Sequence, residues 1–105
     1  MESKSYKLRY LPIFEQDLMS SVNYITNVLK NVDAAIRLVD DIEDAIFERL
    51  KNPTLFETYP SITKREYSYY RIYIHNYVVY YVVIDDVMEI RRLMYGARDT
   101  DKHLY

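Results

Sequence analysis

Eight consecutive apolar residues, Tyr77–Ile84, stand between two residue pairs that favour tight turns, His75-Asn76 and Asp85-Asp86. A strand that is apolar on both faces is typical of the centre of a sheet. The flanking pairs predict short turns, because Asn and Asp tolerate the backbone conformations that turns need. The sequence therefore predicts an antiparallel meander of three strands with Tyr77–Ile84 in the middle.

The two outer strands of this meander sort their side chains by the strand period of two. In the strand before the first turn, one face carries Tyr70, Ile72 and Ile74, and the other carries Tyr69, Arg71, Tyr73 and His75. The last strand, Val87–Tyr95, cannot turn both Ile90 and Leu93 inward if it is regular. We therefore expect a bulge or twist near Arg91-Arg92. Gly96, the one glycine, is expected to take a backbone conformation closed to other residues.

The first half of the chain has the spacing of helices. An alternating run at Lys7–Leu11 predicts a strand, and Pro12 fits the start of a helix. One apolar stripe consists of Phe14, Leu18, Val22, Ile25 and Leu29, and a second of Ala35, Leu38, Ile42, Ala45 or Ile46, and Leu50. Asp33 is a plausible N-cap of the second helix, which stops at Asn52-Pro53. The predicted fold is α+β: a first strand, an antiparallel helix hairpin, and the meander on which the hairpin packs.

Length and composition limit the class of protein. With 105 residues we expect one domain, 1–105, and with no cysteine an intracellular, cytoplasmic home is the simpler interpretation. Tyr77–Ile84 is too short to span a bilayer, and the N-terminus lacks the apolar core of a signal peptide, so no membrane association is expected. The net charge is −2, whereas a dedicated nucleic-acid binder usually has a basic excess.

Acidic residues gather in the second predicted helix, at Asp40, Asp41, Glu43, Asp44 and Glu48. Most avoid the apolar stripe and are expected to coat its solvent side, with Arg37, Arg49 and Lys51 at spacings that allow helical ion pairs. A cation site needs carboxylates that converge from separate elements or a glycine-bearing loop, and neither is visible. Two distant histidines, His75 and His103, are a weak metal signal. We predict no metal and no cofactor.

The end of the chain carries a resemblance. Glu89-Ile90-Arg91-Arg92-Leu93-Met94-Tyr95-Gly96-Ala97-Arg98-Asp99 resembles the last strand of the RelE/ParE superfamily, the toxins of type II toxin–antitoxin pairs. The strand, helix hairpin and meander order resembles the same superfamily over nearly the whole chain, and most closely its ParE or plasmid stabilisation branch. One departure is Tyr95, which stands where that branch commonly has histidine, and a tyrosine exchanges protons near neutral pH only with assistance.

The resemblance implies candidate site residues. In the RelE-like branch a ribose 2′-hydroxyl attacks the adjacent phosphate, which needs proton-transfer groups and cations. By resemblance the catalytic candidates are Arg71, Arg92, Tyr95 and Arg98. Lys64 and Arg65, in the loop predicted over Pro53–Ser68, are weaker candidates for substrate binding, together with Tyr73 and His103. The structural alternative is that the arginines pair with nearby acids such as Glu66 or Glu89 and that Tyr95 only packs.

Two kinds of partner remain open. Seven of the thirteen tyrosines lie between Tyr67 and Tyr81, and tyrosines beside arginines suit nucleobase stacking as well as protein interfaces. Without a basic excess we favour a protein partner. The resemblance implies a cognate antitoxin, and either DNA gyrase as the target of a ParE-like growth inhibitor or the ribosome and its mRNA as the target of a RelE-like endonuclease. An inactive member that only binds its antitoxin is a third alternative, and the oligomeric state is left open.

Overall fold

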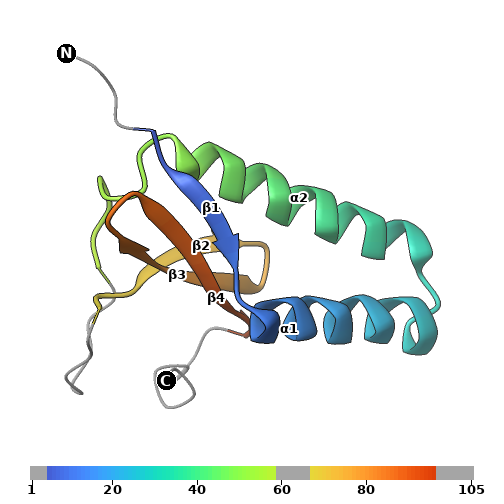
Figure 1. Ribbon diagram of the computed structural model, residues 1–105. Coiled ribbons are helices and arrows are strands. Elements are labelled where there is room, and N and C mark those ends of the chain that lie inside the picture. Colours follow the sequence, from blue (N-terminus) through green and yellow to red (C-terminus); the bar gives the residue numbers. More distant parts are fainter. Residues whose placement is uncertain (1–4, 59–66, 97–105) are drawn as a thin grey trace.

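The computed structural model describes residues 5–58 and 67–96. Its elements are strand β1 (Lys7–Tyr10), helix α1 (Pro12–Asn23), a π-helical turn η1 (Tyr24–Val28), helix α2 (Val32–Leu50), and strands β2 (Tyr70–Ile74), β3 (Tyr77–Ile84) and β4 (Val87–Tyr95). The two helices lie side by side against the sheet, and their far ends project beyond it (Figure 1). This is the predicted α+β fold.

The sheet has the order β1-β4-β3-β2. Strands β2, β3 and β4 form the predicted antiparallel meander. The first strand adds to it in parallel beside β4, so the complete sheet is mixed. His75 and Asp85 begin the two turns with φ of 56° and 55°, and Gly96 follows β4 with φ of 65°. His and Asp are among the residues that adopt positive φ most readily, and glycine does so without strain.

The predicted irregularity in β4 is a bulge at Arg91. Tyr80 pairs with Arg92 and the next residue, Tyr81, pairs with Ile90, so Arg91 has no partner across the ladder. The extra residue resets the alternation of the strand. As a result Ile90 and Leu93 both lie in the core between the sheet and the helices.

The helix hairpin follows the sequence pattern with two corrections. Asn31, and not Asp33, caps α2, because its Oδ1 accepts a hydrogen bond from the Ala34 N–H at 3.0 Å. Asp33 lies instead in the first turn of α2, where its negative charge interacts favourably with the positive end of the helix dipole. The first stripe also ends early: Leu29 is 55% exposed, because the wider turn of η1 changes the phase of the helix before it reaches that residue.

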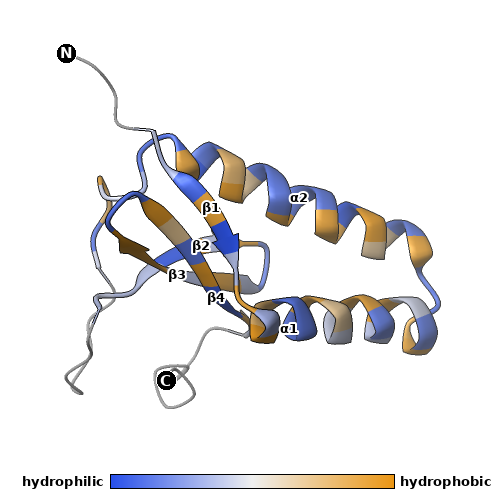
Figure 2. Cartoon of the chain, in the orientation of Figure 1, coloured by the Kyte–Doolittle hydropathy of each residue, from blue (hydrophilic) through white to orange (hydrophobic). Residues whose placement is uncertain are grey.

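The main core lies between the helices and one face of the sheet. Helix α2 buries Ala35, Leu38, Ile42 and Ile46, as its stripe predicts, and Figure 2 shows hydrophobic residues alternating with hydrophilic ones along it. From the sheet this core takes Ile72, Ile74, Val79, Tyr81, Met88, Ile90 and Leu93. A second cluster on the other face contains Tyr69, Val78, Tyr80 and Val82, so β3 is buried on both sides, as predicted for a central strand. No helix in the described part of the chain has the length and apolar character to cross a membrane.

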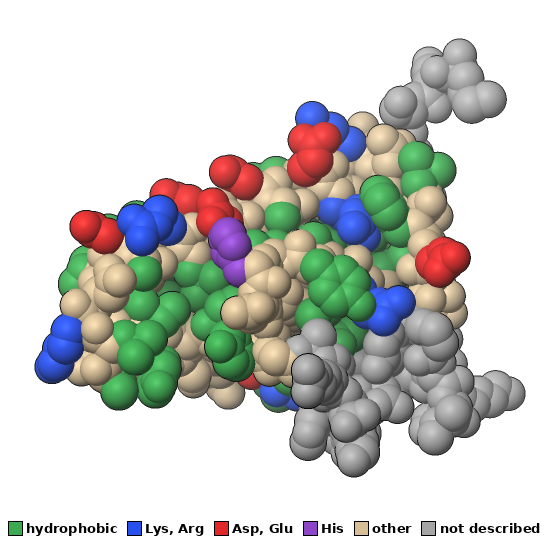
Figure 3. Space-filling view, turned by 180° about the vertical axis from the view of Figure 1, so that it is seen from behind, with side chains coloured by type: hydrophobic (Ala, Val, Ile, Leu, Met, Phe, Trp, Pro, Cys, Tyr) green, Lys and Arg blue, Asp and Glu red, His purple; other side chains and the backbone are tan. Residues whose placement is uncertain are grey.

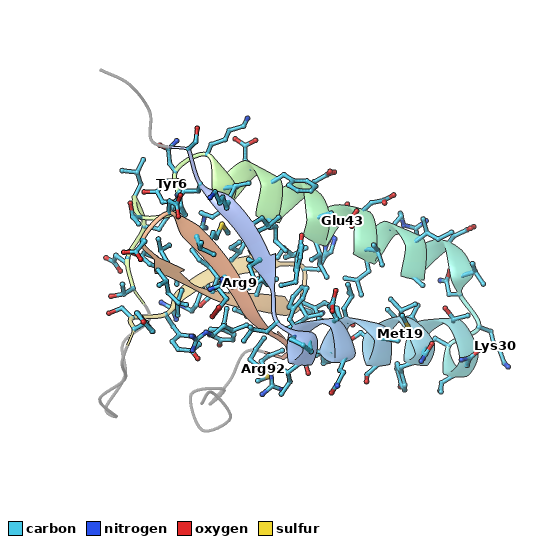
Figure 4. All side chains as sticks on the ribbon, in the orientation of Figure 1. Tyr6, Arg9, Met19, Lys30, Glu43 and Arg92 are labelled. Carbon is cyan, nitrogen blue, oxygen red and sulfur yellow. The ribbon has the colours of Figure 1, made fainter. Side chains whose placement is uncertain are left out.

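Asp17 attaches α1 to the sheet at the point where β1 stops. The last backbone hydrogen bond on that side runs from the Leu11 N–H to the Ile90 carbonyl at 2.9 Å. Farther along β4, the Asp17 carboxylate accepts the Leu93 N–H at 3.0 Å and holds Arg92 through Nε at 2.8 Å and Nη2 at 3.1 Å. The carboxylate therefore takes the place of a neighbouring strand. Figure 4 shows Arg92 beside the first turns of α1.

We expect Asp17→Ala to lower the free energy of unfolding by about 2–3 kcal/mol, because Arg92 loses the carboxylate that holds it against α1 and the Leu93 N–H loses its acceptor. Urea denaturation monitored by circular dichroism measures this change. The matched control is Asp44→Ala, which removes an exposed aspartate from α2 and should change stability by less than about 0.5 kcal/mol. Equal midpoints for the two variants would contradict the assigned role of Asp17.

Candidate functional site

The two sheet arginines predicted for phosphate binding share one face. In the sheet register Arg71 lies opposite Tyr80, and Tyr80 lies opposite Arg92. Residues directly opposite each other in antiparallel strands point to the same side, here the side away from the helices. Arg71 and Arg92 thus flank Tyr80, separated by two strand spacings, about 10 Å.

Each of these arginines already has neighbours in the protein. The fork of hydrogen bonds to Asp17 holds Arg92 and raises the pKa of its guanidinium. The Arg71 guanidinium lies 5.6 Å from the centre of the Tyr73 ring, a cation–π distance. The expected pairing with an acid is therefore present for Arg92, but the acid is Asp17 and not Glu89.

Glu89 pairs with two other arginines. Its carboxylate is 8% exposed and lies 2.8 Å from Nη2 of Arg9 and 3.0 Å from Nε of Arg91. Arg91 also donates to the Tyr69 hydroxyl at 3.2 Å and approaches the Tyr67 ring to 5.8 Å. The bulged residue of β4 is therefore fixed by its own strand and by the segment before β2.

Tyr95 lies away from the arginine pair. It pairs with Tyr77 in the register, on the face that carries Leu93, so it points to the helix side of the sheet. The rings of Tyr95 and Tyr77 meet edge to face at 5.1 Å, and Tyr95 is 68% exposed. The structure brings Arg71 and Arg92 to one face and does not bring Tyr95 to them. Arg98, Lys64, Arg65 and His103, the other candidates, lie outside the described residues.

Two hollows meet at Tyr77 and Tyr95 and form what we call the tyrosine groove. The larger, of about 650 Å³, is lined by Ser20, Ser21, Tyr24, Ile25, Leu29, Asn31, Ala34, Tyr77 and Tyr95. The second, of about 630 Å³, is lined by Tyr73, His75, Asn76, Tyr77, Val78, Tyr95 and Gly96. Among the described residues, no Lys, Arg, Asp or Glu lines either hollow. The tyrosine groove is therefore rich in aromatic side chains, with neutral polar residues such as Ser20 and Asn76 among them, and its described lining carries almost no charge.

An acidic ridge on α2, formed by Asp40, Glu43, Asp44 and Glu48, lies beside this groove. All four side chains are exposed, as predicted for the solvent side of the helix. His75, at the rim of the groove, contacts Asp41 of α2 through Nε2 at 2.6 Å. Figure 3 shows acidic side chains in a row along α2 and, next to them, a histidine, which the contact with Asp41 identifies as His75. Within residues 5–58 and 67–96, no three His, Asp or Glu side chains gather to hold a metal ion.

Sequence reasoning missed a polar network at the C-terminal end of α2. The Tyr81 hydroxyl, inside the core, donates to the Pro53 carbonyl at 2.7 Å and accepts from Nη1 of Arg49 at 3.0 Å. The same Nη1 donates to the Arg71 carbonyl at 3.1 Å. The spacing of Arg49 would allow an ion pair on the surface of α2, but Arg49 faces inward and makes these contacts instead. A signal was available: Arg49 follows Ile46 by three residues and so continues the buried stripe.

Comparison with solved structures identifies the fold. The structure of the chromosomal ParDE TA system from P. aeruginosa contains a chain that matches with a TM-score of 0.73 and 16% identity, over 89% of this chain and 98% of that one. The RelB-RelE antitoxin-toxin complex from Methanococcus jannaschii matches with a TM-score of 0.49 and 19% identity, over 91% of this chain and 99% of that one. The first likeness shows the same fold, a helix hairpin on a four-stranded mixed sheet.

The sequence identifies the family. Residues 8–100 match the model of the family described as ParE toxin of type II toxin-antitoxin system, parDE. This match covers nearly all of the chain, so the protein belongs to the ParE toxin family. No curated protein matches it.

The buried hydroxyl of Tyr81 makes the free energy of unfolding fall at alkaline pH. Burial is the largest cause that raises the pKa of Tyr81 above 10.0, although the hydrogen bond from Arg49 lowers it. Above pH 10 the unfolded chain therefore releases this proton before the folded chain does. Since the unfolded state then binds fewer protons, stability must fall as the pH rises.

We expect Tyr81→Phe to show a smaller loss of stability between about pH 9 and pH 11 than the unmodified protein. At neutral pH the variant should be less stable by about 1–2 kcal/mol, because the Pro53 carbonyl and Arg49 lose their partner. Urea denaturation at a series of pH values measures both effects. Tyr95→Phe, which removes an exposed hydroxyl, is the control, and an identical pH dependence in both variants would refute the role of Tyr81.

Proposed function

We propose that this ParE-family toxin inhibits growth by binding a protein target, DNA gyrase, and that a cognate antitoxin neutralises it. Both partners are carried over from the family resemblance and from the toxin–antitoxin systems whose fold it shares. This function places the protein in the cytoplasm, where gyrase acts on DNA.

The observation that carries the proposal is the position of Tyr95. Cleavage of a phosphodiester needs cations beside the groups that transfer protons. Tyr95 points to the helix side of the sheet, and Arg71 and Arg92 point to the other. Within residues 5–58 and 67–96, the tyrosine groove around Tyr95 has no Lys, Arg, Asp or Glu in its lining but exposes large aromatic surfaces, which are enriched where proteins bind proteins. These features favour a protein target over RNA.

One observation favours the second candidate, a RelE-like mRNA endonuclease. Arg71 and Arg92 lie in one row across the sheet, a placement that suits two successive phosphates. Against this stands Asp17, which already holds Arg92 by two hydrogen bonds. Binding of a phosphate by Arg92 would have to compete with that carboxylate.

The acidic ridge gives an expectation for the antitoxin. Among the described residues, the one ion pair that involves these four exposed carboxylates joins Glu48 to Lys51 at 3.2 Å. Arg37 is exposed on the same helix but pairs with none of them there. We therefore expect the antitoxin segment that crosses α2 to carry lysine or arginine residues. Such pairs would mainly raise the rate of association and make it depend on salt.

The decisive experiment is tightly controlled expression of the chain, with and without its antitoxin, followed by analysis of plasmid supercoiling and of mRNA cleaved at the ribosomal A site. Relaxed plasmid with intact message supports the gyrase target. Cleaved message with normal supercoiling supports the endonuclease instead. A chain that leaves growth unchanged would be an inactive member of the family.

Tyr95→Ala should restore growth and weaken binding to purified gyrase by about 30-fold, because truncating an exposed aromatic at the centre of an interface typically costs about 2 kcal/mol. Phe47→Ala is the matched control: Phe47 is an exposed aromatic on α2 that lines neither hollow of the groove. Surface plasmon resonance and growth curves provide the measurements. Equal losses in both variants would argue against the tyrosine groove as the target site.

Arg71→Ala distinguishes the two candidate functions. If the target is gyrase, the variant should retain growth inhibition, because Arg71 lies on the face away from Tyr95. If the chain cleaves mRNA, the variant should abolish cleavage while antitoxin binding stays largely intact. Arg92→Ala supports the same reasoning only after its folding has been verified, since it also breaks the attachment to Asp17.

A further inference from the structure

A third hollow, of about 370 Å³, lies where α2 ends beside the edge strand β2. It is lined by Ala45, Glu48, Arg49, Lys51, Asn52, Leu55, Phe56 and Ile72. Leu55 and Phe56 are exposed, so this hollow has an apolar wall open to solvent with a guanidinium beside it. None of its lining residues belongs to the tyrosine groove.

Arg49 is held rigidly in this hollow. Its Nη1 donates to the Arg71 carbonyl at 3.1 Å and to the Tyr81 hydroxyl at 3.0 Å, which accounts for both hydrogens of that nitrogen. The guanidinium carbon lies 3.6 Å from the centre of the Phe56 ring, so the plane is also fixed by stacking. A side chain that is ordered in this way loses little further entropy when a ligand binds.

The opposite edge of the guanidinium has no acceptor. Arginine has five N–H groups, and the three on Nε and Nη2 meet no hydrogen-bond acceptor among the described residues. No carboxylate pairs with Arg49 in that part of the chain either, whereas Arg9, Arg91, Arg92 and Lys51 each have one. A half-buried cation without a counter-ion is costly, and the edge formed by Nε and Nη2 is the one that grips a carboxylate with two parallel bonds.

We propose that this hollow is a binding site for a carboxylate next to an apolar group, supplied by an acidic residue of a partner protein. The carboxylate binds the Nε and Nη2 edge of Arg49, and the apolar neighbour packs on Leu55 and Phe56. A phosphate of a nucleic acid fits less well. Lys51 is already paired with Glu48 and so offers no second free cation to a phosphate backbone. A sugar beside the phosphate would also give Leu55 and Phe56 little apolar surface to pack against.

The test uses the folded chain and small probes. The Nε–Hε signal of Arg49 in a ¹⁵N NMR spectrum is followed during titration with 3-phenylpropionate, with the neutral isostere 3-phenylpropanamide, and with inorganic phosphate. We expect a saturable shift with the carboxylate and at least about tenfold weaker binding of the other two probes. No saturable shift, or equal shifts with the amide, would overturn the site, and tighter binding of phosphate would replace the protein ligand with a nucleic acid.

Variants keep the test independent of folding defects. Arg49→Lys keeps the charge but loses the paired N–H groups, and should weaken probe binding about tenfold. Arg37→Lys makes the same change on the exposed surface of α2 and should have no effect. If Arg49→Lys is unstable, Leu55→Asp serves instead. Leu55 is 75% exposed, so the variant should fold, and its own carboxylate should occupy Arg49 and exclude the probe.

Binding measurements with the antitoxin and the target then show which of these partners supplies the carboxylate. This step rests on the proposed function, whereas the probe titration does not. A tenfold loss of antitoxin affinity in Leu55→Asp, measured by calorimetry, assigns the site to the antitoxin. Unchanged antitoxin affinity with lost growth inhibition assigns it to the target. If the variant changes neither, the site has no part in binding these partners and the assignment to a partner protein is wrong.

Discussion

The carboxylate of Asp17 is the contact on which the arrangement of this fold depends. The first strand ends before β4 does, so half of β4 would have an open edge if α1 did not lie beside it. Asp17 closes that edge by accepting one backbone N–H and by holding Arg92, and in doing so it sets where the helix hairpin sits on the sheet. The position of the hairpin in turn sets how its far end lies over the end of the sheet, and the larger hollow of the tyrosine groove is formed between that end and Tyr77 and Tyr95.

Most of the fold could be predicted because its signals are local. The meander, its two turns and the bulge follow from the alternation of neighbouring residues, and the buried stripe of α2 follows from steps of three and four. The features that sequence missed depend on contacts between distant residues. Asp17 meets Arg92 across 75 positions and Arg49 meets Tyr81 across 32, and no periodicity reports such a pair. The capping of α2 by Asn31 is a local feature, but the prediction placed the cap two residues later, at Asp33.

The candidate site was predicted only in part. The resemblance selected Arg71, Arg92 and Tyr95 along the sequence, but the face on which each lies depends on register, and the bulge at Arg91 decides it for β4. Arg71 and Arg92 lie on one face of the sheet and Tyr95 on the other, whereas the tyrosine groove runs around the end of the sheet and takes Tyr73 and Val78 from the arginine face. Within the described residues a row of exposed acids follows α2, so net charge alone does not describe what a partner would meet at that helix.

The bulge at Arg91 also governs how the end of the chain tolerates changes in length. The residues of β4 before the bulge and those after it alternate out of step with each other. Both sets face the correct sides of the sheet because β4 has one more residue than β3 at this point. Loss of Arg91 alone would leave Ile90, Arg92 and Leu93 in regular alternation, so the bulge would disappear while Leu93 stays on the core side. Loss of Met94, in the regular part of β4 beyond the bulge, would instead turn Tyr95 to the other face of the sheet.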